Sequence, residues 1–475
     1  MKKIIIVLLS IVALTTSCNR NITDLNIDPK NPSSAPSYAL FTNAQRTLMN
    51  TLTSSNVNLN IYRLIVQYWQ ETTYTDESNY DLATRDINDA VWDALYRDVL
   101  RDFQEAKTLI PTDVANADVQ KNELAITDIL EVVTWYYLVT TYGDIPYSEA
   151  LDINNPFPKY DDAKTIYSDL LARLDADISA LNTASGSFET ADIIYNGDIA
   201  AWKLFANSFK LKMGMTIADV DNETAKTTVE SAVAAGVFTS NDDNAVFRYL
   251  STPPNTNPIW VDLVQSGRKD FVGASTIVNT MGTLDDPRIN AYFTIDANGG
   301  YSGGNPGESS NYATFSKPAE TITAPDFPAS LLDYSEVEFL LAEAIERGYN
   351  VGATAAIHYN NAVTASVVEW GGTEADASSY LSQPSVNYTT ATGTYKEKIG
   401  TQKWIALYNR GWDAWIEWRR FDYPQLVPAA SALSDIPLRY PYPVNEQNVN
   451  RLNYEAASAA IGGDDVTTKL WWDKN

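Results

Sequence analysis

The strongest constraint on the fold is a helical repeat of apolar side chains that recurs along most of the chain. Apolar residues return at three- and four-residue steps, which places them on one face of a helix. These stripes lie at residues 92–110, 126–140, 163–181, 202–213 and 337–345. A further helix is expected from about Ala353 to Glu369, with Gly348 as the C-terminal cap of the helix before it. The sequence therefore predicts a mostly α fold of helical hairpins that resemble tetratricopeptide repeats, without a regular repeat in sequence.

Two loop-rich inserts interrupt the helices. Residues 239–330 and 371–398 are dense in Gly, Pro, Asn and Ser, and aromatic residues punctuate both. Irregular stretches of this length are usually functional or disordered, and the aromatic content favours ordered recognition loops. We therefore expect the binding function in the inserts and a scaffold role for the helices.

The amino terminus is typical of a bacterial lipoprotein signal. Two lysines precede an apolar run at residues 4–14 that is too short to span a bilayer of about 30 Å as a helix. Small residues follow, and then Cys18, the only cysteine of the chain. Cleavage before a lipidated Cys18 leaves residues 1–17 as the signal peptide and residues 18–36 as a lipid-anchored tether. An ordinary secretory signal is the alternative.

The charge balance argues against two classes of partner. The chain has 60 Asp and Glu against 34 Lys and Arg, a formal net charge of -26. Phosphate contacts need clustered Lys and Arg, so neither a nucleic acid nor an anionic membrane surface is an expected partner. No later apolar run approaches the length of about 18 residues that a membrane helix needs. Residues 37–475 are expected to form a single helical domain that contains both inserts.

The chain offers little material for catalysis. It has one histidine, His358, and one cysteine, which is assigned to lipid, so a metal cluster, a Ser-His-Asp triad and a Cys-His pair are not expected. A glycosidase needs only two carboxylates, and the sequence does not exclude such a pair. Asp296, Asn298 and Glu308 resemble calcium ligands without the EF-hand spacing. We expect no enzyme activity, no metal and no cofactor; a structural calcium is left open.

Three segments combine aromatic and amide side chains as sugar or peptide ligands require. Sugar rings stack their C–H faces on aromatic rings and bond through their hydroxyls, whereas peptides need an extended groove. The predicted ligand contacts are Trp69, Tyr74 and Asn79 in residues 67–80, Trp260 and Arg268 in residues 255–271, and Tyr301 and Asn305 in residues 298–312. For each residue the alternative is a side chain that anchors its loop, and Trp260 is also a candidate for the core.

Six motifs occur in order along the chain. They are YGDIPYSEAL (142–151), WKLFANSFKLKM (202–213), LDDPRINAYF (284–293), YSEVEFLLAEAIERG (334–348), QKWIALYNRGWDAWIEWRRFDYPQL (402–426) and IPLRYPYPVNEQNVNRLNY (436–454). Together with the lipoprotein signal they resemble the SusD/RagB family of outer-membrane nutrient-binding lipoproteins, in particular its SusD-like branch. The motifs themselves are expected to be scaffold: on a 402–420 helix, Trp404, Leu407, Tyr408, Trp415 and Trp418 share one face, as core residues do.

The resemblance implies a fold, a place and a role. The fold is a right-handed α-superhelix of tetratricopeptide-like hairpins with long loop-rich insertions. The place is the outer membrane, where a lipid anchor holds the protein with its ligand site facing the cell exterior. The role is to bind an oligosaccharide or glycan, or in some members a peptide, and to deliver it to a partner, a SusC-like TonB-dependent transporter. A surface glycoside hydrolase and an adhesin are the alternatives outside this role.

Overall fold

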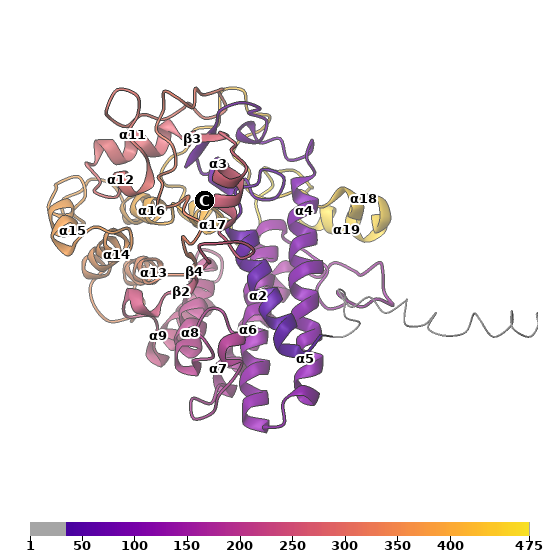
Figure 1. Ribbon diagram of the computed structural model, residues 1–475. Helices are drawn as coiled ribbons and strands as arrows, with labels where there is room; N and C mark the ends of the chain where they lie inside the picture. Colours follow the sequence, from indigo (N-terminus) through magenta and orange to yellow (C-terminus); the bar gives the residue numbers. More distant parts are fainter. Residues whose placement is uncertain (1–34, 475) are drawn as a thin grey trace, which may run out of the picture.

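The structure, a computed structural model, describes residues 35–474, so the expected signal peptide and Cys18 lie outside the described residues. The longer helices are α2 (Ser37–Thr53), α5 (Arg101–Asp113), α6 (Ala117–Tyr142), α7 (Ala163–Ala180), α8 (Ile199–Thr216), α9 (Asn222–Ala235), α13 (Tyr334–Glu346), α14 (Ala355–Glu369), α16 (Tyr395–Ala406) and α17 (Gly411–Phe421) (Figure 1). The shorter ones are α3 (Tyr62–Ile65), α4 (Ile87–Asp93), α10 (Pro258–Trp260), α11 (Ser275–Thr283), α12 (Ile289–Tyr292), α15 (Glu374–Leu381), α18 (Val444–Val449) and α19 (Arg451–Ala460). The prediction of a mostly α fold is confirmed.

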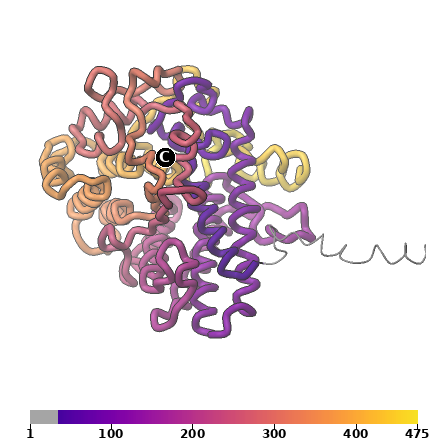
Figure 2. Tube along the Cα trace, in the orientation of Figure 1, coloured from indigo at the N-terminus to yellow at the C-terminus, as the bar shows by residue number. Residues whose placement is uncertain are grey.

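The helices pack as consecutive pairs with capped ends. α6 packs on α7, α8 on α9 and α13 on α14, as expected for tetratricopeptide-like hairpins. Asp162 caps α7, Asp198 caps α8 and Asp333 caps α13 by accepting backbone N–H groups of the first turn. After α13 the chain turns at Gly348, whose φ of +79° favours glycine. The C-terminal part of the chain then returns to the N-terminal part, where α17 packs on α3 (Figure 2).

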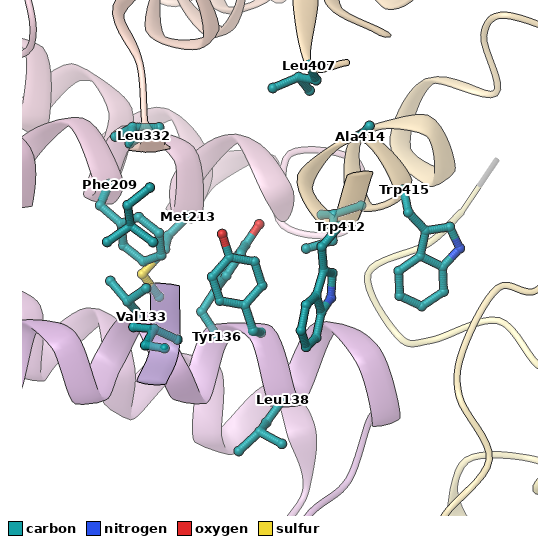
Figure 3. Packing of buried hydrophobic residues seen from close by; sticks show 14 of the residues in the cluster. Val133, Tyr136, Leu138, Phe209, Met213, Leu332, Leu407, Trp412, Ala414 and Trp415 are labelled. Atoms are coloured by element: carbon teal, nitrogen blue, oxygen red, sulfur yellow. The ribbon is translucent and has the colours of Figure 1, made fainter. Parts of the chain in front are cut away.

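The main core lies between these helix layers. Figure 3 shows Val133 and Tyr136 of α6, Phe209 and Met213 of α8, and Trp412 and Trp415 of α17 within one cluster. The Trp412 ring stacks on the Tyr62 ring of α3 with their centroids 4.4 Å apart. Charges are also buried here: the Lys212 ammonium, fully buried, lies 3.0 Å from the Glu336 carboxylate. None of the helices described between residues 35 and 474 is both long and apolar enough to cross a membrane.

Two small antiparallel sheets fix the first insert to the helices. β2 (Ala245–Phe247) pairs with β4 (Ala329–Leu332), so the two ends of the 239–330 insert are joined at its base. β1 (Trp69–Glu71) pairs with β3 (Phe271–Gly273), which ties the middle of the insert to the chain that follows α3. The insert is therefore held at two places against the helical body.

Three details differ from the sequence-based expectation. The 239–330 insert contains the helices α11 and α12 as well as loops. The 371–398 insert contains α15, which begins with a capping box formed by Thr373 and Asp376. The expected 402–420 helix is two helices, because the chain turns between α16 and α17. The core role predicted for this motif is nevertheless confirmed, since its five residues are all buried: Trp404, Leu407, Tyr408, Trp415 and Trp418.

Candidate functional site

The β1/β3 pair brings together the three segments that the sequence predicts to bind ligand. β1 belongs to the first segment, and β3 begins where the second one ends. Thr72 extends the pairing, since its N–H donates to the Asp270 carbonyl at 2.8 Å. The Thr72 carbonyl accepts the N–H of Ser310 at 3.0 Å, which places the third segment beside the first. Residues more than two hundred positions apart thus lie side by side.

The buried side chain of Gln70 joins the first and third segments. Its Oε1 accepts the N–H of Gly307 at 2.8 Å, and its Nε2 donates to the Glu308 carbonyl at 2.8 Å. Gly307 has a φ of +79°, and a Cβ there would lie 2.5 Å from the Asn79 side chain, so the position requires glycine. We call the surface formed by residues 69–80, 261–275 and 294–323 the loop face. It lies around β3 and the start of α11 (Figure 1).

Trp69 is a core residue, so its prediction as a ligand contact is wrong. Its side chain is 2% exposed, and its indole N–H donates to the Tyr408 hydroxyl at 2.8 Å. The sequence placed Trp69 at the edge of a helical stripe. In the structure α3 ends at Ile65, and the left-handed backbone of Gln67 (φ 57°) turns the chain into β1. The change from helix to strand turns the ring inward.

Two other predicted contacts, Asn79 and Tyr301, anchor their loops, and a third, Trp260, is half-buried. Asn79 is 8% exposed, and its Nδ2 donates to the carbonyls of Thr75 at 2.8 Å and Gly307 at 3.0 Å. Tyr301 is half-buried and packs against the main core. Trp260, the last residue of α10, is also half-buried. For Asn79 and Tyr301 the structure thus favours the alternative, a side chain that holds its loop in place.

Three predicted contacts reach solvent on the loop face. Tyr74 is 78% exposed and stands in a left-handed turn with a φ of 55°. Arg268 is exposed, with its Nε 2.6 Å from the Asp270 carboxylate. Asn305 is exposed, and its Nδ2 donates to the Glu308 carboxylate at 3.2 Å. These side chains remain candidates for ligand contact.

A pocket of ≈ 190 Å³ opens between the second and third segments. It is lined by Leu263, Val264, Arg268, Asp270, Phe271, Thr294, Tyr312, Lys317, Pro318, Glu320 and Thr323. The ammonium nitrogens of Lys269 and Lys317 lie 5.7 and 5.3 Å from the centroid of the Tyr312 ring. Sequence reasoning missed both lysines. Lys317 lies outside the third predicted segment, residues 298–312, and only the fold places it in the lining of the pocket.

Two buried carboxyl groups lie beneath the exposed turn of the first segment. Glu71 is 4% exposed and Glu77 is fully buried. Burial raises the pKa of Glu71 to about 9; the Ser78 N–H, which donates to Glu71 at 2.9 Å, opposes this increase, and the Glu77 carboxyl adds to it. Arg85 forms an ion pair with Glu77. At neutral pH Glu71 is therefore protonated and uncharged.

Two other hollows of the described chain are lined by charges that already pair with each other. In a cavity of ≈ 80 Å³ beside β4, the Arg410 guanidinium lies 2.8 Å from the Asp333 carboxylate. In a hollow of ≈ 270 Å³ between α5, α6 and α7, Arg173 lies 2.7 Å from Asp128. An open groove of ≈ 600 Å³ runs beside Tyr38 of α2. The loop-face pocket differs from these two because Lys317 in its lining has no carboxylate within 4.0 Å among the described residues. Lys269, beside Tyr312, has none either.

His358 and Asp296 are both engaged within the fold. His358 is 7% exposed, and its Nδ1 lies 2.8 Å from the Glu338 carboxylate between α14 and α13, as in a structural pair. Asp296 accepts the N–H groups of Asn298 at 2.8 Å and Gly300 at 3.0 Å, so it closes its own turn. Within residues 35–474, no group of three or more His, Cys, Asp or Glu side chains is placed to hold a metal ion.

Comparison with known proteins gives consistent relatives. A family model described as SusD-like, "Starch-binding associating with outer membrane", matches residues 29–443. The structure is similar to that of a chitin-binding protein, with 28% identity and a TM-score of 0.81 over 92% of this chain and 100% of that chain. It is similar to a chitin-binding SusD homolog from Flavobacterium johnsoniae, with 26% identity and a TM-score of 0.80 over 92% and 99% of the two chains. A SusD homolog from Bacteroides uniformis has 27% identity and a TM-score of 0.81 over 92% and 100%. No curated protein sequence matches the chain.

Proposed function

The chain belongs to the SusD-like family, and from this premise we propose that its loop face binds a glycan at the bacterial outer membrane. Two of the similar structures are those of chitin-binding proteins, at 28% and 26% identity, which supports a sugar polymer as the class of ligand. The rest of the proposal depends on the geometry of the loop face.

One observation carries the proposal: three aromatic and amide-rich segments, distant in sequence, form one surface with a pocket. Tyr74 offers an exposed ring at 78% exposure, which suits stacking on the C–H face of a sugar. Arg268 and Asn305, both exposed, offer hydrogen-bond donors and acceptors for hydroxyl groups. The backbone bonds of Thr72 hold the three segments in place before a ligand arrives.

The proposed role is capture for transport. The lipoprotein signal supports attachment through Cys18, which leaves the loop face free to meet ligands at the cell exterior. A TonB-dependent outer-membrane transporter is the proposed partner, because the resemblance implies it. The protein is proposed to hold its ligand without cleaving it: the buried carboxyls Glu71 and Glu77 do not reach the surface.

A binding experiment tests the ligand class. The protein starting at Asn19 is titrated by calorimetry with chitin and starch oligosaccharides, acidic oligosaccharides and a peptide panel, and the same samples are analysed for products. We expect saturable binding of a glycan and no new products. Binding of peptides alone would replace the glycan with a peptide ligand, and new products would overturn the non-enzymatic role.

Two variants locate the site. Tyr74→Ala should weaken glycan binding roughly three- to tenfold, since it removes a stacking platform without changing the core. Tyr38→Ala, on the exposed surface of α2 at 55% exposure, is the matched control and should leave binding unchanged.

For the transport role, Cys18→Ala should release the protein from outer membranes, and the wild-type protein should co-purify with a large barrel protein. Wild-type protein without such a partner would favour adhesion.

A further inference from the structure

Two lysine side chains on the loop face have no acidic partner among residues 35–474, although the chain as a whole is strongly acidic. The formal net charge is -26, so carboxylates are plentiful. Lys269 and Lys317 nevertheless place their ammonium nitrogens 5.7 and 5.3 Å from the centroid of one ring, that of Tyr312. Among residues 35–474, no carboxylate oxygen lies within 4.0 Å of either ammonium nitrogen.

The backbone of both lysines is fixed. The Lys317 carbonyl accepts the Thr294 N–H at 2.9 Å, and the Lys317 N–H donates to the Thr294 hydroxyl at 3.1 Å. The Lys269 carbonyl accepts the hydroxyl of Thr72 at 2.6 Å. Hydrogen bonds from two different segments therefore fix the backbone of both lysines beside Tyr312, which reduces the ordering that a ligand must impose.

Two buried basic side chains of the helical body are paired with acids. Lys212 lies between Glu336 and Asp413, and Arg420 pairs with Glu343 and Glu417. These pairs neutralise buried charge. On the loop face, Arg268 is paired with Asp270, so among the described residues Lys317 is the basic residue of the pocket lining that has no carboxylate within 4.0 Å. Lys269 lies beside the pocket, at Tyr312.

The position of the lysines also limits what Tyr312 does. A neutral sugar stacks on an aromatic ring whose face is open, whereas the Tyr312 ring carries two ammonium groups within cation–π range. Their nitrogens lie 5.7 and 5.3 Å from the centroid of one ring, so both cations attract an anion that binds beside that ring. Tyr312 thus positions the lysines, and stacking is left to Tyr74.

On the basis of the proposed glycan-binding function, we propose that the glycan is acidic. A carboxylate or sulfate group of the sugar binds beside Tyr312, within reach of Lys269 and Lys317, and Arg268 contacts the hydroxyls beside it. The pocket of ≈ 190 Å³ admits such a group with part of its ring. Glu320 and Asp270 at the rim disfavour more than one anionic group at this position.

The test compares matched ligands on the full mature protein. Calorimetry uses oligogalacturonate, its neutral methyl ester, a sulfated oligosaccharide of similar length and a neutral chitin oligosaccharide. We expect at least one of the two anionic ligands to bind tenfold or more tightly than the methyl ester and the chitin oligosaccharide. That advantage should shrink as salt rises to about 0.5 M, because exposed charges are screened. The tighter of the two anionic ligands identifies the group as a carboxylate or a sulfate.

Variants assign the effect to the lysines. Lys269→Met and Lys317→Met keep most of the aliphatic stem, and each should remove most of the anionic preference while leaving the methyl ester unchanged. Lys164→Met, an exposed lysine of α7, is the control and should have no effect. The acid and its methyl ester are compared on the same variant. A partial loss of folded protein therefore affects both ligands equally and does not change the ratio of their affinities.

The outcomes distinguish the acidic-ligand inference from the proposed glycan-binding function on which it rests. Equal binding of acid and ester, or an anionic preference that survives both lysine variants, overturns the acidic ligand but leaves glycan binding in place. Absence of binding to every glycan, acidic or neutral, overturns both.

Discussion

At the scale of single residues, the buried carboxyl pair under the exposed turn controls how stability depends on pH. Burial raises the pKa of Glu71 to about 9, with a contribution from the Glu77 carboxyl beside it. A raised pKa in the folded state means that the stabilising contribution is complete below the unfolded value of about 4.5 and is lost as the pH rises toward 9. Alkaline conditions should therefore loosen the turn that carries Tyr74.

Glu71→Gln should remove this dependence, because an amide keeps the shape of the protonated acid and does not ionise. Between about pH 5 and pH 8.5 the free energy of unfolding of the wild type should fall relative to the variant by on the order of 4–5 kcal/mol, about 1.4 kcal/mol per pH unit. Urea denaturation at several pH values measures the difference. Glu105→Gln, on the exposed side of α5, is the control. Parallel pH profiles for the wild type and Glu71→Gln would contradict the burial argument.

Alanine substitutions at Trp69 and Tyr74 should differ strongly in their effect on stability. Trp69→Ala removes a core ring that is bonded to Tyr408 and tilted against Phe271, so it should cost about 3–5 kcal/mol of stability. Tyr74→Ala removes a ring that is 78% exposed and should shift the unfolding free energy by about 0.5 kcal/mol or less. Thermal and urea unfolding of both variants check this. A Trp69→Ala protein as stable as the wild type would show that the ring is not a core residue.

At the scale of elements, Gln70 in β1 links the strand pair to the third segment. Gln70→Ala would leave the Gly307 N–H and the Glu308 carbonyl without their partner, at a cost of about 1–3 kcal/mol that acts locally. Hydrogen exchange should rise in residues 302–310 and stay unchanged in α6 and α8. Gln265→Ala, an exposed glutamine of the same surface, should change neither region. Uniform exchange changes would mean that the loop has no local stability of its own.

Sequence periodicity predicted the helices better than the breaks between them. The stripes at 163–181 and 337–345 correspond to α7 and α13, because apolar spacing reports directly on a buried helical face. The apolar spacing over residues 402–420 did not reveal the turn between α16 and α17. Both helices bury their aromatic residues, and the spacing continues across the turn. The change of Trp69 from helix to strand was hidden for the same reason.

The sequence indicated the three segments that form the loop face, but not which of their side chains are exposed. Aromatic and amide-rich composition marked the three segments that meet at Thr72. Burial within a segment depends on pairing between distant strands, which is why Asn79 and Tyr74, close in sequence, differ so much in exposure. Lys269 and Lys317 become neighbours only through the fold, and neither belongs to a periodic pattern.

At the scale of the whole molecule, the helical body provides stability and the loop face presents the groups proposed to bind ligand. The helices bury the large aromatic cluster and pair their charges internally, as Lys212 and Arg420 show. The loop face is fixed to this body by β1/β3 and β2/β4 and carries exposed aromatic and cationic groups that the body does not need for stability. Ligand binding at the loop face is therefore expected to leave the helix pairs unchanged.

Hydrogen exchange with and without a bound glycan tests this central claim most directly. The mature protein is compared alone and with the oligosaccharide that binds best in the titrations, and protection is mapped along residues 35–474. The account predicts slower exchange in residues 69–80, 261–275 and 294–323, with α6, α8 and α13 unaffected. Protection confined to the helices, or centred on the groove beside Tyr38, would contradict it.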